Sequence, residues 1–168
     1  MFAAVYHTLK TIDPELQLGG GGCFPSIALE ENGLPRFLRE MRQCGCMPDF
    51  ITLQCYPHEQ ILQDIDFLYF TSNQVSAPSV LSKDRDFTRH FLDKIHHMLE
   101  QIGCGDVPVV VEEWNSTLWQ RDLSSDTCYK AAWLVKNALQ SYDRTEALGY
   151  WLLTDFIDEW LIPGGVFH

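Results

Sequence analysis

The chain has 168 residues, of which 46% are hydrophobic and 21% are charged, and its formal net charge at pH 7 is −11. This composition excludes a disordered chain, and no apolar run is long enough to cross a membrane. The negative charge disfavours nucleic acid and anionic membranes as partners, whereas a neutral carbohydrate is compatible with it. Because the N-terminus has no signal-peptide pattern, we expect a cytoplasmic location.

Hydrophobic periodicity and turn residues predict four helices and four strands in alternation. The first helix covers residues 2–12 and ends at Asp13-Pro14, since proline disfavours the α conformation of the residue before it. A short strand follows and runs into four consecutive glycines, which we interpret as a loop beside a ligand. Residues 58–82 are predicted to form a loop with a short helix. The other predicted helices are 34–44, 85–102 and 127–142, and the predicted strands are 16–19, 50–55, 107–112 and 148–154.

This alternation is typical of a single α/β domain over residues 1–168 with a parallel sheet. Taken alone, it fits a small doubly wound sheet or half of an eight-stranded barrel. The chain stops at residues 164–168 without a terminal helix, as expected if a longer barrel had been cut.

The six cysteines are scattered, and we expect free thiols rather than disulfides or zinc ligands. The closest pair, Cys44 and Cys46, lies at a helix end and is interpreted as packing or incidental. The histidines form no ligand pattern either, so neither a metal nor another cofactor is predicted.

The segment from Val107 to Thr117 reads V-P-V-V-V-E-E-W-N-S-T and is the most informative part of the sequence. Consecutive β-branched residues indicate a strand buried on both faces, and polar groups at the C-terminal end of such a strand occupy the place where α/β barrels carry their sites. A carboxylate there can attack an anomeric carbon, an aromatic ring can stack on a sugar, and an amide can bind hydroxyls. The alternative is a strand that ends in a solvated Glu-Glu pair.

Four segments in this order resemble glycoside hydrolase family 39, the β-xylosidase and α-L-iduronidase family. They read IDPELQLGG from Ile12, DFI…YP from Asp49, VVEEWNS from Val110 and GYWLLTD…DE from Gly149. The resemblance implies a (β/α)8 TIM barrel, of which this chain would be the C-terminal half with strands five to eight. It implies a retaining glycosidase acting on xylosides or related sugars. The chain looks most similar to the hydrolase-like domains of bacterial AraC-type transcription regulators.

The resemblance also assigns roles to individual residues. Glu113 matches the nucleophile, and Tyr56 matches a residue that donates a hydrogen bond to that carboxylate. Asn115 matches a residue that steadies the nucleophile's surroundings in the substrate site, and Trp151 matches a platform for the sugar ring. The acidic pair that binds sugar hydroxyls is matched by Asp158 and Glu159.

The sequence departs from the family pattern in three places. Gln54 replaces a histidine, and Glu112 replaces a residue that is usually threonine. The Asn-Glu-Pro motif, which carries the general acid/base, does not occur in these 168 residues. Retaining hydrolysis needs two carboxyl groups about 5 Å apart, so we expect the chain alone to be inactive. The alternative function is a non-catalytic sugar-sensing domain of a bacterial transcription regulator.

Half of a barrel leaves two strand edges unpaired, and such edges tend to pair with other chains. We expect Ile51, Leu53, Val109 and Val111 to point into the barrel interior and to be uncovered in the half. The sequence therefore predicts a homo-oligomer, with the first and last strands at the contact.

Overall fold

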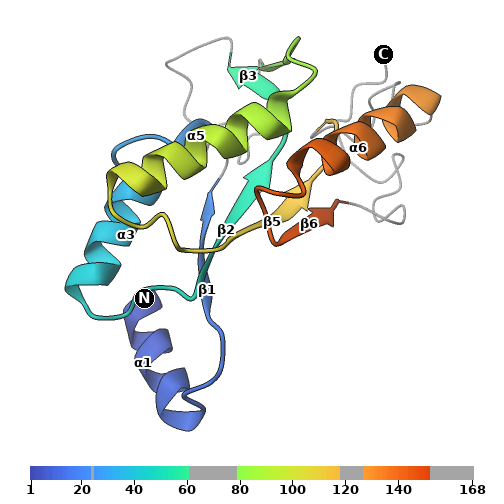
Figure 1. Cartoon of the computed structure of the whole chain (residues 1–168). Coiled ribbons are helices and arrows are strands. Elements are labelled where there is room, and N and C mark those ends of the chain that lie inside the picture. Colours follow the sequence, from blue (N-terminus) through green and yellow to red (C-terminus); the bar gives the residue numbers. More distant parts are fainter. Residues whose placement is uncertain (24, 61–78, 118–126, 152–168) are drawn as a thin grey trace, which may run out of the picture.

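A four-stranded parallel sheet forms the centre of the protein (Figure 1). The computed structural model describes residues 1–23, 25–60, 79–117 and 127–151. Within them, the neighbours in the sheet follow the order β1-β2-β5-β6, and each adjacent pair is parallel. These strands are β1 (Gly19–Cys23), β2 (Phe50–Cys55), β5 (Val109–Trp114) and β6 (Ala147–Tyr150).

The four predicted helices are confirmed to within two residues at each end. They are α1 (Phe2–Ile12), α3 (Leu34–Gln43), α5 (Phe87–Gln101) and α6 (Cys128–Ser141), and a further short helix is α2 (Pro25–Ala28). Figure 1 shows α1 beyond the end of the sheet where the strands begin and β3 beyond the opposite end. None of the helices in the described residues is long and apolar enough to cross a membrane.

The first strand was predicted in the wrong place, because the glycine run is itself the strand. β1 pairs with β2 through Gly19–Phe50, Gly20–Ile51 and Gly21–Thr52. Glycine has low intrinsic strand propensity, but here the neighbouring backbone decides the conformation. The missing side chains also make room, since a Cβ on Gly19 would lie 2.2 Å from the Phe50 ring. Residues 16–18 precede the strand and are held by the hydrogen bond from Leu18 N to Asp49 Oδ2 (2.8 Å).

The region predicted as a loop with a short helix contains a two-stranded antiparallel sheet. β3 (His58–Gln60) pairs with β4 (Ser79–Leu81). Residues 61–78 separate these strands and lie outside the described residues. Because the pairing is not local, no two-residue turn signal marked it in the sequence.

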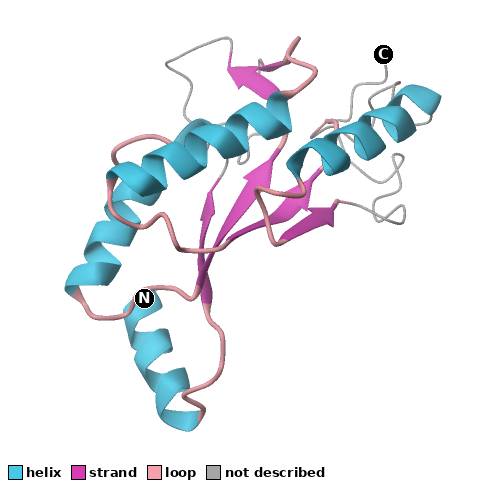
Figure 2. Ribbon diagram, in the orientation of Figure 1, coloured by secondary structure: helices cyan, strands magenta, loops and turns pink. Residues whose placement is uncertain are grey.

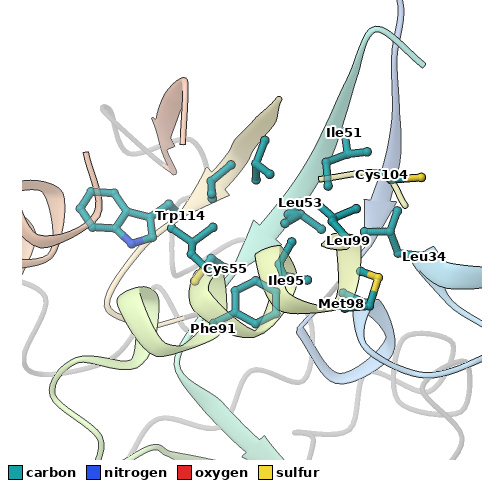
Figure 3. Packing of buried hydrophobic residues seen from close by; sticks show 14 of the residues in the cluster. Leu34, Ile51, Leu53, Cys55, Phe91, Ile95, Met98, Leu99, Cys104 and Trp114 are labelled. Atoms are coloured by element: carbon teal, nitrogen blue, oxygen red, sulfur yellow. The ribbon is translucent and has the colours of Figure 1, made fainter. Parts of the chain in front are cut away.

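The core lies between one face of the sheet and helices α3, α5 and α6 (Figures 2 and 3). The prediction that alternate apolar strand residues face the barrel interior is wrong. They point instead toward the helices, and Ile51, Leu53 and Val111 are 0% exposed and Val109 is 2% exposed. Strands buried on both sides carry apolar residues on both faces, so the sequence did not distinguish the two.

The opposite face of the sheet is open within the described residues. Phe50, Thr52, Gln54 and Val110 lie on it and are half-buried. A doubly wound sheet has helices on both faces, so covering on one face agrees with a barrel type of sheet. For the last strand, residues 147–150 confirm the prediction, and residues 152–154 lie outside the described part of the chain.

Candidate active site

A β-bulge near the end of β5 determines where the two consecutive carboxylates lie. β5 is in register with β2 through Leu53–Val111 and then through Gln54–Glu113, so Glu112 is the extra residue. A bulge interrupts the alternation of side chains and re-aims the residues beside it. Trp114 consequently returns to the core, whereas Glu112 is exposed and Glu113 is half-buried. The strand ends at Trp114, two residues later than predicted, because β2 continues to pair with it beyond the bulge.

The predicted hydrogen bond between Tyr56 and Glu113 is present. Tyr56 Oη donates to Glu113 Oε2 at 3.0 Å, and the tyrosine is only 3% exposed. Burial raises the pKa of Tyr56 far above its ordinary value, and the hydrogen bond to Glu113 and its negative charge raise it further. The phenol therefore stays protonated and holds the carboxylate in one orientation at the C-terminal end of the sheet.

Trp114 anchors the strand end that carries Glu113. Its indole Nε1 donates to Thr88 Oγ1 on α5 at 3.1 Å, and its ring lies 5.2 Å from the ring of Trp133 on α6. Thr88 is completely buried, so its hydroxyl is a fixed acceptor. The sequence analysis missed Thr88 and Trp133, because their contacts span long stretches of chain and leave no local pattern.

Asn115 connects the ends of β5 and β6. Its side-chain amide donates to the carbonyl oxygen of Trp151, and its Oδ1 accepts from Ser116 N at 2.7 Å. The residue is 7% exposed, and these bonds occupy both ends of its amide. This arrangement fits the predicted role of steadying the surroundings of Glu113. Trp151 follows the end of β6, and the residue as a whole is 42% exposed.

Glu112 adds a second carboxylate that the sequence analysis left without a role. Its Oε1 lies 3.5 Å from the point where a Cβ on Gly22 would be, so it reaches across β2 to the end of β1. Gly22 has a φ of +51° and donates its N–H to Thr52 Oγ1 at 3.0 Å. Burial, and then the charge of Glu112, raises the pKa of the Cys23 thiol. The carboxylate thus lies over a part of the sheet that glycine keeps free of side chains.

A pocket of about 290 Å³ lies beside this arrangement. Pro57 and Ser116 line it and directly follow Tyr56 and Asn115 in the sequence. Its other lining residues are Leu81, Ser82, Lys83, Asp84, Arg85, Tyr129 and Trp133. Lys83, Asp84 and Arg85 make part of the lining polar, and neither Tyr56 nor Glu113 belongs to it. The predicted acidic pair, Asp158 and Glu159, lies outside the described residues. Among those described, no group of three or more His, Cys, Asp or Glu side chains could hold a metal ion.

Comparison with protein families and curated proteins gives a consistent result. The sequence model of glycosyl hydrolases family 39 matches residues 1–168. A beta-xylosidase of Geobacillus stearothermophilus is 21% identical over 173 residues, which cover 100% of this chain and 31% of that protein. A beta-xylosidase of Caldicellulosiruptor saccharolyticus is 26% identical over 152 residues, covering 90% of this chain and 28% of that protein. The chain therefore spans about a third or less of these relatives.

Solved structures show the same fold. A monomeric beta-xylosidase from Caulobacter crescentus CB15 superposes with a TM-score of 0.70 at 21% identity, over 94% of this chain and 29% of that one. The GH39 enzyme from Xanthomonas axonopodis pv. citri gives a TM-score of 0.70 at 20% identity with the same coverage. These likenesses support a TIM-barrel type of α/β fold.

Proposed function

Because the chain belongs to glycosyl hydrolases family 39, we propose that it forms the C-terminal half of a retaining glycosidase barrel that acts on xylosides or related sugars. In this proposal its sheet supplies strands five to eight. The coverage of 31% and 28% of the two curated relatives supports this, since most of their length has no counterpart in the chain. Both relatives are named beta-xylosidases, and this suggests the class of sugar.

The observation that carries the proposal is the hydrogen bond of 3.0 Å from Tyr56 Oη to Glu113 Oε2. It fixes a carboxylate at the end of a parallel strand, where barrel enzymes place their reacting groups. In a retaining mechanism, a carboxylate oxygen of Glu113 attacks the anomeric carbon and the bond to the leaving oxygen breaks. Water then attacks the same carbon and releases Glu113. Asn115 supports the strand end, and Trp151, Asp158 and Glu159 bind the sugar.

The general acid/base comes from outside these 168 residues. No Asn-Glu-Pro motif is present to protonate the leaving oxygen. Positioned acid catalysis is typically worth about 10²- to 10⁴-fold, so the chain alone turns over ordinary xylosides at a negligible rate. In the parent protein, the upstream half of the barrel provides this carboxylate.

Trapping the glycosyl-enzyme tests the assignment of Glu113 separately from turnover. A 2-deoxy-2-fluoroxyloside with a dinitrophenolate leaving group reacts without acid assistance, because that phenolate is already stable. We expect a single fluoroxylosyl unit on the peptide that contains Glu113, detected by mass spectrometry. Glu113→Gln should abolish the label, and Tyr56→Phe should slow it. Glu146→Gln, which removes an equal charge from the start of β6, should leave it unchanged.

Labelling of a different carboxylate would contradict the role of Glu113. The same trapping should be repeated with the complete reading frame, in which both halves of the barrel are present. If that protein binds xylose but is never labelled, the result would favour the alternative, a non-catalytic sugar-sensing domain of a regulator.

A further inference from the structure

The pocket of about 290 Å³ has no role in the proposed hydrolysis, because neither Tyr56 nor Glu113 lines it. Its lining joins segments that are far apart in the sequence, namely the loop after β4, the residues that follow β2 and β5, and the first turns of α6. Figure 1 shows that α5 and α6 begin at this end of the sheet. The volume is at the lower end of the range for small-molecule sites, so the pocket suits a ligand of about the size of one monosaccharide.

Two cationic side chains line this pocket, those of Lys83 and Arg85. Both residues are exposed, and neither forms an ion pair with an acidic side chain of the described residues. By contrast, Arg89 and Arg144 both pair with Asp93, at 3.1 and 2.8 Å. Because the chain as a whole carries a net charge of −11, two cations without acidic partners create a local positive potential that attracts an anion.

The acidic residue between these cations, Asp84, does not neutralise them. Its Oδ2 lies 2.7 Å from His90 Nδ1, and its Oδ1 accepts from Asp86 N at 2.9 Å, so both carboxylate oxygens already have partners. Lys136 Nζ donates to the carbonyl oxygen of Arg85 at 2.9 Å and fixes the backbone there. The loop that carries the two cations is therefore held in place before a ligand arrives, which lowers the entropy lost on binding.

The charge and the shape of the lining indicate the class of anion. A phosphate carries a charge between about −1.5 and −2 at pH 7, so the negative charge of Asp84 opposes it more strongly than it opposes a carboxylate. The guanidinium of Arg85 has the planar geometry that binds a carboxylate through two hydrogen bonds. Tyr129 also lines the pocket and is 50% exposed, so its ring has free surface for an apolar contact with a sugar ring.

We propose that this pocket binds a sugar acid, with Lys83 and Arg85 on its carboxylate and Tyr129 against its ring. The ligand is bound without a covalent step. Because the lining does not include Glu113, binding here does not depend on the proposed glycosidase function.

Isothermal titration of the full chain with D-glucuronate, at constant ionic strength, tests the site. We expect one saturable site per chain, and a large excess of xylose should not displace the glucuronate, since xylose has no anionic group. Inorganic phosphate should bind more weakly than glucuronate. Affinity should fall as salt is added, because the cations are exposed and are screened by ions. Absence of saturable binding, displacement by xylose, or equally tight binding of phosphate would each overturn the proposal.

Three matched variants identify the cations that hold the ligand. Arg85→Gln should weaken glucuronate binding about 10-fold or more, and Lys83→Gln about 3- to 10-fold, as expected for hydrogen bonds between charged groups. Lys94→Gln removes an exposed lysine from α5 and should leave the affinity unchanged. All three changes are at exposed residues, so folding should be preserved, which far-UV circular dichroism checks. Full affinity in Arg85→Gln, or an equal loss in Lys94→Gln, would overturn the proposal.

Discussion

The two faces of the four-stranded sheet differ in how far other elements cover them. On the helix-covered face, Leu53 and Val111 are completely buried against α5 and its neighbours. On the open face, Phe50 and Val110 remain half-buried, and the carboxylate of Glu112 is exposed. The packing that stabilises the chain therefore lies on the covered face. The proposed catalysis depends instead on the rest of the barrel, which would enclose the open face.

The largest effect that we expect from this difference is on the state of association. The outer edges of β1 and β6 have no partner strand within the described residues, and the open face between them is partly apolar. We predict a homodimer in contact through these two strands, because open edges favour pairing between chains. Light scattering at micromolar concentration should give twice the mass of the chain. A compact and stable monomer would contradict this prediction.

Truncation of one aliphatic residue on each face compares the two faces. Leu53→Ala creates a cavity on the covered face and should lower the free energy of unfolding by about 2–5 kcal/mol. Val110→Ala on the open face should lower it by less than about 1 kcal/mol. Urea denaturation measures both values. Equal losses would mean that the open face is covered in solution.

The pairing of β5 with β6 depends on a close approach at Gly149. A Cβ at this position would lie 2.4 Å from the carbonyl oxygen of Glu112, a backbone atom that has little freedom to move. Gly149→Ala should therefore destabilise the protein by about 1–3 kcal/mol, as overpacking usually does. Gly105→Ala is the control, since its nearest neighbour would be the flexible Glu100 side chain at 3.4 Å. Similar losses in thermal unfolding for both variants would contradict the proposed cause.

A smaller effect is expected at Asp49, which precedes β2 and joins it to α1. Its Oδ2 accepts from Leu18 N at 2.8 Å and pairs with Lys10 Nζ at 3.0 Å. Burial raises the pKa of Asp49, but the bonds from Leu18 and Lys10 outweigh it, and the net shift is downward. Asp49→Asn should cost about 1 kcal/mol at neutral pH, allowing for partial exposure.

The dependence of this loss on pH follows from the direction of the shift. A carboxylate whose pKa is lowered by folding contributes fully above its unfolded pKa of about 3.9, and its contribution is lost as the pH falls through the folded value. The stabilities of the native protein and Asp49→Asn should therefore converge below about pH 4. An exposed carboxylate, Asp106, serves as the control, and a constant difference down to low pH would contradict the assignment.

Much of the fold followed from local patterns, and the errors have identifiable causes. β2 was predicted with its observed bounds, because Phe50–Cys55 is β-rich and Pro57 follows it closely. β1 was misplaced since its conformation comes from its neighbour rather than from its glycines. β3 and β4 were missed because their partners are far apart in sequence. The direction of Ile51 and Leu53 was wrong, because an apolar run does not reveal which face the helices cover.

For the candidate site, the residues could be predicted from the sequence, but the contacts that orient them could not. The family resemblance identified Tyr56 and Glu113, and the structure joins them by a hydrogen bond. The bulge that gives Glu113 its direction depends on register with β2, which no local pattern encodes. For the same reason the position of the Glu112 side chain was not predicted, although this side chain reaches the end of β1.

The anchoring of Trp114 has a consequence for motion at the rim of the sheet. Strand ends usually fray, but this one is fastened through Thr88 and Trp133 to the interior of two helices. Local opening at Glu113 must therefore break core contacts, so its backbone should open only together with the whole domain. In hydrogen exchange, the amide of Trp114 should be protected as strongly as that of Val111, whereas Thr88→Val should release the strand end selectively. The rigidity of the proposed nucleophile would then derive from α5, a helix that carries none of the residues proposed to bind the sugar.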